Sequence, residues 1–143
     1  MKLGIFLPGR LASERLPNKL ILPIGNVCLW EIACKKLSEL PEAYEKAVLI
    51  CDDKLITIAK KYPNISIIRR SKASANKDGP LVEIFGGLKA MKATHLMFLN
   101  PCLAFLTKET ILEALDSFEL NQVDYATSVL GKLNLHVPLI ELL

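Results

Sequence analysis

Short apolar runs alternate with amphipathic stretches along this 143-residue chain, and no other feature constrains its fold as strongly. The apolar runs are bounded by polar segments, which is typical of strands buried in a parallel sheet. They cover residues 2–7, 47–51, 65–68, 95–99 and 125–129. The stretches between them carry apolar residues at helical spacing and predict helices over residues 29–40, 54–62, 81–91 and 108–120. This order predicts an α/β fold, a doubly wound and mostly parallel sheet with helices on both faces.

Residues that start or stop helices stand at the ends of these helical stretches. Pro41 and Pro63 follow the first two stretches, and a proline disfavours helical backbone in the residue before it. Pro80 stands at the entrance to the third stretch, where its fixed backbone angle suits the first helical turn. Thr107 precedes the fourth stretch and is predicted to cap it.

Length and charge exclude several classes of protein. A chain of 143 residues fits one domain, which we expect to span residues 1–143. The net charge is only +3, and no cationic stripe is interleaved with aromatic residues, so nucleic acid is not an expected partner. No apolar stretch approaches the roughly 18 residues that a membrane span requires, so no membrane association is expected. Met1 leads directly into the first predicted strand, and no signal peptide is expected.

The four cysteines (Cys28, Cys34, Cys51 and Cys102) include no Cys-x-x-Cys pair. The spacing of Cys28 and Cys34 fits neither a zinc knuckle nor a redox motif. We therefore expect reduced, mostly buried thiols in a cytoplasmic protein.

The first apolar run leads into a cationic loop that reads Leu-Pro-Gly-Arg-Leu-Ala-Ser-Glu-Arg-Leu-Pro-Asn-Lys from Leu7 to Lys19. Gly9 lets the backbone approach an anion closely, and successive loop N–H groups can form an anion-binding concavity. Arg10 and Arg15 can grip phosphate oxygens bidentately, and Lys19 supplies a compact charge. Because ligands of doubly wound sheets bind at the carboxyl ends of strands, this loop is predicted to bind phosphate. The alternative is a solvated basic loop.

The loop fits the pattern Pro-x-Arg-x-x-Ser-x-Arg-Leu-Pro-x-Lys, with matches at Pro8, Arg10, Ser13, Arg15, Leu16, Pro17 and Lys19. This pattern resembles the signature of sugar-activating cytidylyltransferases, the synthetases of CMP-N-acetylneuraminate and CMP-3-deoxy-manno-octulosonate. The resemblance covers roughly residues 2–129 and implies a Rossmann-like nucleotidyltransferase fold. It implies an enzyme that transfers CMP from CTP to a small acidic 2-keto sugar and releases pyrophosphate, with Mg²⁺ as cofactor. Such products serve lipopolysaccharide or polysaccharide biosynthesis, and a homodimer is one assembly that the resemblance allows.

The resemblance also implies roles for single residues. Arg10 and Lys19 would be catalytic, because they would neutralise the phosphates during transfer. The expected nucleotide-binding residues are Leu7, Pro8, Gly9, Arg10, Ser13, Arg15 and Lys19, with Arg70 and Asp78 from the loop after the third apolar run. Asn100 stands where relatives bind the sugar through an amide, although strand-end asparagines also form simple turns.

The metal ligands are not identified by the sequence. Octulosonate-type relatives hold magnesium through an aspartate near the position of Asn100, and this chain has no acidic residue between Lys92 and Glu109. Asp52 and Asp53 follow the second apolar run and could bind Mg²⁺ through oxygen ligands. Capping of the following helix by one of them is the favoured alternative.

Two other functions fit the sequence. The relatives are longer, so the chain is expected to lack their C-terminal part, and a catalytically reduced relative would bind nucleotide without turnover. The stretch Asp78-Gly79-Pro80-Leu81-x-x-Ile84-x-x-Gly87-Leu88 is similar to one in molybdenum-cofactor guanylyltransferases, which implies GTP as the nucleotide. The apolar residues 137–143 fit a final helix or strand, a partner-binding edge, or the start of a further segment.

Overall fold

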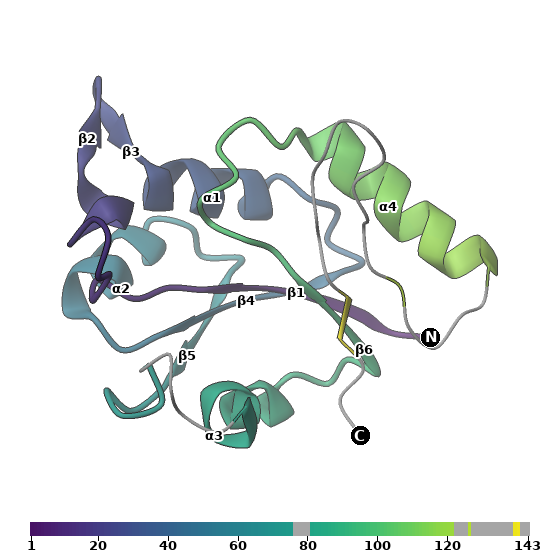
Figure 1. The fold of residues 1–143 in the computed structure, drawn as a ribbon. Helices are drawn as coiled ribbons and strands as arrows, with labels where there is room; N and C mark the ends of the chain where they lie inside the picture. The colour runs from purple at the N-terminus through teal and green to yellow at the C-terminus, as the bar shows by residue number, and fades with distance from the viewer. Residues whose placement is uncertain (76–80, 122–125, 127–138, 141–143) are drawn as a thin grey trace.

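A computed structural model describes residues 1–75, 81–121, 126 and 139–140 and contains a five-stranded sheet in the order β5-β4-β1-β6-β7 (Figure 1). Four strands run parallel, and β7 pairs antiparallel with β6. Their bounds are β1 Leu3–Pro8, β4 Glu45–Ile50, β5 Ser66–Arg69, β6 His95–Phe98 and β7 Leu139–Ile140. The chain steps outward from β1 to β4 and β5, then returns to β6 on the other side of β1. The predicted mostly parallel sheet is confirmed, and its topological switch point lies between β1 and β6.

Helices cover both faces of this sheet, as predicted. The strands alternate their side chains between two cores, so Ile5 and Leu7 face one side while Phe6 faces the other. On the first face lie α1 (Leu29–Ser38), α2 (Asp53–Ala59) and α4 (Lys108–Asn121), whose buried residues join that core. The opposite face is covered by α3 (Leu81–Phe85) and the short 3-10 helix η2 (Gly86–Ala90).

The predicted N-cap of α4 is confirmed, because the Thr107 hydroxyl accepts a hydrogen bond from the Thr110 N–H at 3.2 Å. Within the described part of the chain, no helix is long and apolar enough to cross a membrane. All four cysteines are free thiols, Cys28 and Cys34 fully buried and the other two half-buried.

The single helix predicted over residues 81–91 is wrong, because it breaks at Gly86 into α3 and η2. A Cβ at Gly87 would lie 3.0 Å from Ile68 Cγ2 and 3.3 Å from Leu49 Cδ1. The segment therefore runs close against the sheet at Gly87, and two adjacent glycines favour helix poorly. Of the predicted strand 125–129, all residues except Ala126 lie outside the described ones.

A small hairpin follows the cationic loop and was not predicted. It joins the 3-10 helix η1 (Lys19–Ile21) to α1 through β2 (Pro23–Ile24) and β3 (Val27–Cys28). Gly25 has φ +61° at the first central position of a two-residue turn, which suits glycine. The hairpin projects beyond the sheet beside α1 (Figure 1).

The start of the cationic loop is fixed by packing against Trp30 of α1. This side chain is fully buried, and its Nε1–H donates to the Leu55 carbonyl at 3.0 Å. The Gly9 N–H donates to the Leu49 carbonyl at 3.1 Å. A Cβ at Gly9 would lie 2.8 Å from Trp30 Cζ3 and 3.1 Å from Ile50 Cγ2. Glycine is therefore required at this position by the close approach of an indole ring.

Gly9→Ala is expected to lower the free energy of unfolding by about 1–3 kcal/mol, because the buried indole is hydrogen-bonded and cannot move aside freely. Chemical denaturation monitored by circular dichroism measures this change. Gly86→Ala is the matched control, because a Cβ there meets no atom within 4 Å. Equal stability of the two variants would contradict the packing role of Gly9.

Candidate functional site

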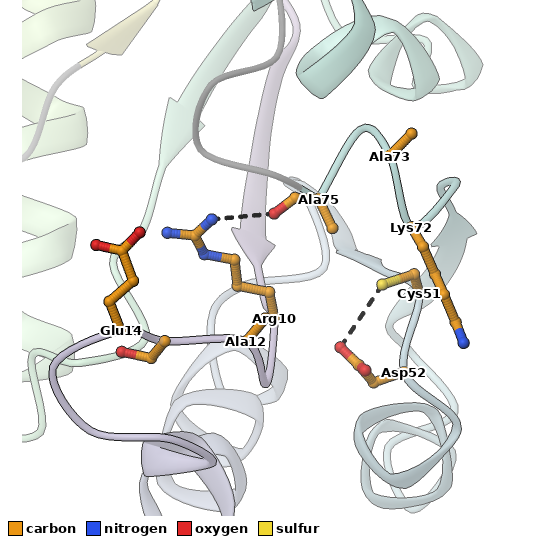
Figure 2. A pocket seen from close by; sticks show the side chains of 9 residues that line it. Arg10, Ala12, Glu14, Cys51, Asp52, Lys72, Ala73 and Ala75 are labelled. Carbon is orange, nitrogen blue, oxygen red and sulfur yellow. Dashed lines mark hydrogen bonds between the residues drawn. The ribbon is translucent and has the colours of Figure 1, made fainter.

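A cavity of about 610 Å³ opens at the carboxyl ends of β1, β4 and β5 (Figure 2). This volume lies within the range of roughly 300–1,000 Å³ that is typical of small-molecule sites. Three loops form its walls, one after each strand. The lining residues are Arg10, Ala12, Ser13 and Glu14 after β1, Cys51 and Asp52 after β4, and Lys72, Ala73 and Ala75 after β5.

Arg10 connects two walls of the cavity. Its Nη1–H donates to the Ala75 carbonyl at 3.1 Å, so the guanidinium bridges the loops after β1 and β5 (Figure 2). A guanidinium carries five N–H donors, more than this carbonyl uses. The half-buried cation at this place can therefore accept a further anionic partner.

Arg70 follows the end of β5 and supports Gly9, the first residue after β1. Its Nη2–H donates to the Gly9 carbonyl at 3.1 Å, and its own N–H donates to the Ile50 carbonyl at 3.0 Å. The buried Nε has no hydrogen-bond partner among the described residues. Burial lowers the pKa of the Arg70 guanidinium, and the nearby Arg10 cation lowers it further, whereas Cys51 and Asp52 raise it. Two cations thus stand close together at this edge of the sheet.

Asp52 occupies the N-cap position of α2, but its side chain makes no capping hydrogen bond. Its Oδ2 instead accepts the Leu11 N–H at 3.1 Å and the Cys51 thiol at 3.6 Å. The predicted capping by its side chain is therefore wrong, because the loop after β1 lies within reach and supplies other donors. Asp53 points to solvent and pairs with Arg69 at 3.6 Å.

Burial raises the pKa of the Cys51 thiol, and the adjacent Asp52 carboxylate raises it further. The opposing effects of Arg70 and Lys72 are smaller. The thiol is thus kept neutral at ordinary pH and can donate to Asp52. Nothing in this arrangement activates Cys51 as a nucleophile.

The predicted site residues are spread over this region. Arg10 and Ser13 line the cavity, and Arg70 binds its wall through Gly9. The remaining loop residues take up backbone or flanking positions: Leu7 is buried in the core, Pro8 ends β1, Arg15 is exposed, and Lys19 is half-buried at the start of η1. Asp78 lies outside the described residues.

Asn100 follows β6 and forms a turn, since its Oδ1 accepts the Cys102 N–H at 2.9 Å. It is not among the residues that line the cavity. Sequence reasoning did not assign Glu14, Cys51 or Lys72 to the site. Their positions directly after a strand, or within the cationic loop, are the signal that could have placed them there.

No group of three or more histidine, cysteine, aspartate or glutamate side chains within the described residues could hold a metal ion. The cavity contains two carboxylates, Asp52 and Glu14, on different loops. Mg²⁺ commonly uses one or two carboxylates together with phosphate oxygens and water. This part of the chain therefore fits a metal carried by a phosphate ligand better than one held by the protein alone.

The sheet order and the cationic loops at the strand ends define a nucleotidyltransferase-like α/β fold. The model of the cytidylyltransferase family matches residues 5–138, and the chain belongs to that family. Among curated proteins, none matches the chain.

Solved structures share the fold at low identity. A cytidylyltransferase from Leptospira borgpetersenii has a TM-score of 0.75 at 22% identity, covering 96% of this chain and 60% of that one. A CMP:2-keto-3-deoxy-manno-octonic acid synthetase solved with CTP has a TM-score of 0.73 at 15% identity, covering 89% and 52%. A 4-diphosphocytidyl-2C-methyl-D-erythritol synthase from Anaerococcus prevotii has a TM-score of 0.62 at 16% identity, covering 95% and 61%. The chain thus spans between 52% and 61% of the length of these structures.

Arg70→Met is expected to lower the free energy of unfolding by about 1.5–3 kcal/mol, because the Gly9 carbonyl loses a charged donor. The neighbouring Arg69→Met variant removes only a largely exposed ion pair and should change stability by less than about 1 kcal/mol. Urea unfolding of both variants checks this difference. Arg70→Met with the stability of the unmodified chain would show that the contact with Gly9 is energetically neutral.

Proposed function

We propose that this chain transfers CMP from CTP to a small acidic 2-keto sugar. The observation that carries the proposal is the cavity at the ends of three parallel strands, where Arg10 and Lys72 line the walls and Arg70 stands behind the loop. Family membership supports CTP as the nucleotide. The loop pattern from Pro8 to Lys19 supports the acidic sugar as acceptor.

The reaction would join the anomeric hydroxyl oxygen of the sugar to the α-phosphorus of CTP. The bond between the α-phosphorus and the bridging oxygen would break, the pyrophosphate would leave with the negative charge, and the hydroxyl proton would pass to solvent. The protein would act by positioning and by stabilising this charge. Arg10 and Lys19 would neutralise the phosphates, while Ser13 and Arg15 would fix the triphosphate in the loop.

The remaining residues would complete binding around the triphosphate. We assign Arg70 and the backbone of Leu7, Pro8 and Gly9 to the floor of the triphosphate-binding site. Asp78 is assigned as a further contact of the nucleotide. The Asn100 Oδ1 is engaged in a turn, so a contact with the sugar would be donated by its amide nitrogen.

Mg²⁺ would supply charge neutralisation when bound to the phosphates. Because the described carboxylates form no ligand cluster, phosphate oxygens and water would provide most of its ligands. The proposal also places the chain in the cytoplasm, which the four free cysteines support. We further propose that the chain forms a homodimer and serves lipopolysaccharide or polysaccharide biosynthesis.

CTP with Mg²⁺ is expected to raise the thermal stability of the chain, by about 2.7 kcal/mol at 100 times the dissociation constant. ATP, UTP and GTP should give smaller shifts in the same differential scanning experiment. Lys19→Ala should abolish most of the CTP effect, whereas Lys60→Ala, an exposed lysine at the end of α2, should retain it. In a turnover assay with acidic 2-keto sugars, Lys19→Ala should lose roughly 3–4 kcal/mol of transition-state stabilisation.

Three results would count against the proposal. A shift selective for GTP would favour guanylyl transfer instead. Binding of CTP without turnover on any acidic sugar would identify a catalytically reduced nucleotide-binding protein. No shift with any nucleotide would remove the phosphate-binding role of the loop.

A further inference from the structure

The cationic loop is tied to the strand ends by a small set of hydrogen bonds. Arg70 holds the Gly9 carbonyl, and the Gly9 N–H binds the Leu49 carbonyl. Two residues further on, Asp52 Oδ2 accepts the Leu11 N–H at 3.1 Å. Leu11 lies between Arg10 and Ser13, both of which line the cavity. The Asp52 carboxylate therefore holds the middle of the segment that carries these two side chains.

The hydrogen bond from the Leu11 N–H to the Asp52 carboxylate is expected to be strong for two reasons: its charge and the rigidity of its acceptor. A carboxylate that accepts a backbone N–H forms a charge-assisted hydrogen bond, roughly twice as strong as a neutral one. Asp52 lies at the end of β4, whose residues Ala47–Ile50 are fully buried, so the acceptor is fixed to a rigid element. Although Asp52 occupies the N-cap position of α2, its side chain makes no capping hydrogen bond to that helix. The carboxylate accepts the Leu11 N–H instead, which explains why this N-cap residue does not cap α2 with its side chain.

We propose that Asp52 is a positioning residue that holds the Leu11 amide and so keeps Arg10 and Ser13 directed into the cavity. The effect on nucleotide binding rests on the proposed function, whereas the contact with the loop does not. Asp52 would thus act on the ligand through the loop, not as a ligand of Mg²⁺.

The test uses three variants of the full chain. Asp52→Ala removes the acceptor, Asp52→Asn keeps an oxygen that can accept the Leu11 N–H but removes the charge, and Asp53→Asn is the matched control. Asp53 is largely exposed, and among the described residues its carboxylate forms an ion pair only with Arg69. If Asp52→Ala fails to fold, Asp52→Asn still reports on the contact.

Amide hydrogen exchange of the nucleotide-free protein tests the contact itself. Leu11 should exchange at least about tenfold faster in Asp52→Ala, which corresponds to a loss of about 1.4 kcal/mol. Asp52→Asn should show a smaller increase, and Asp53→Asn none. The Gly9 amide, which is bound to the Leu49 carbonyl, serves as the internal reference. Unchanged exchange of Leu11 in Asp52→Ala and Asp52→Asn would overturn the proposal whether or not CTP binds.

Titration with CTP tests the consequence for the site. Asp52→Ala should bind CTP about tenfold more weakly, and Asp52→Asn should recover most of this loss at an unchanged Mg²⁺ requirement. Equal losses in both variants, offset by excess Mg²⁺, would identify Asp52 as a metal ligand and overturn the positioning role. If the unmodified chain binds no CTP, the proposed function fails while the exchange result still decides the contact.

Discussion

The arrangement of this site depends on the close approach of Gly9 to the buried indole of Trp30. The indole Nε1–H is fixed to Leu55 of α2, and the Gly9 amide is fixed to Leu49 of β4. Gly9 thereby links β1 to α1, through Trp30 to α2, and to the neighbouring strand β4. The chain leaves the sheet at this point and continues into the cationic loop.

Cations from separate strand ends converge around the cavity that results. Arg10 comes from the loop after β1, while Arg70 and Lys72 follow β5. The two arginines donate hydrogen bonds to the main-chain carbonyls of Ala75 and Gly9. These cations share the cavity with the Asp52 and Glu14 carboxylates, so an anionic ligand would be bound by directed N–H donors and not by a net positive charge of the lining.

The sequence predicts the type of sheet, mostly parallel with helices on both faces, but not the order of its strands. Apolar runs located the four parallel strands to within two residues at each end, because burial on both faces leaves a continuous signal. The hairpin strands β2 and β3, and also β7, have two residues each, which is too short for a recognisable pattern of apolar residues. The break at Gly86 was missed because helical spacing continues through it, while the contact of Gly87 with Ile68 and Leu49 depends on tertiary packing.

In the candidate site too, features with a local sequence pattern could be predicted, and features that depend on tertiary contacts could not. The cationic loop was found from its residue types and spacing, and Arg10, Ser13 and Arg70 lie at or behind the cavity. The role of Asp52 could not be found this way, because an aspartate before a helix predicts a cap, and the competing donor comes from a residue far away in the sequence. The reason for glycine at position 9 was likewise hidden, since the indole that requires it lies in α1.

The most direct test of the central claim is an NMR titration of the full chain with CTP and, separately, with cytidine. If the loop after β1 binds the triphosphate, amide signals of residues 9–19 and 71–75 will shift with CTP in the presence of Mg²⁺. The same signals will barely respond to cytidine, which lacks phosphates. Shifts confined to other parts of the sheet, or equal responses to both compounds, would contradict the account.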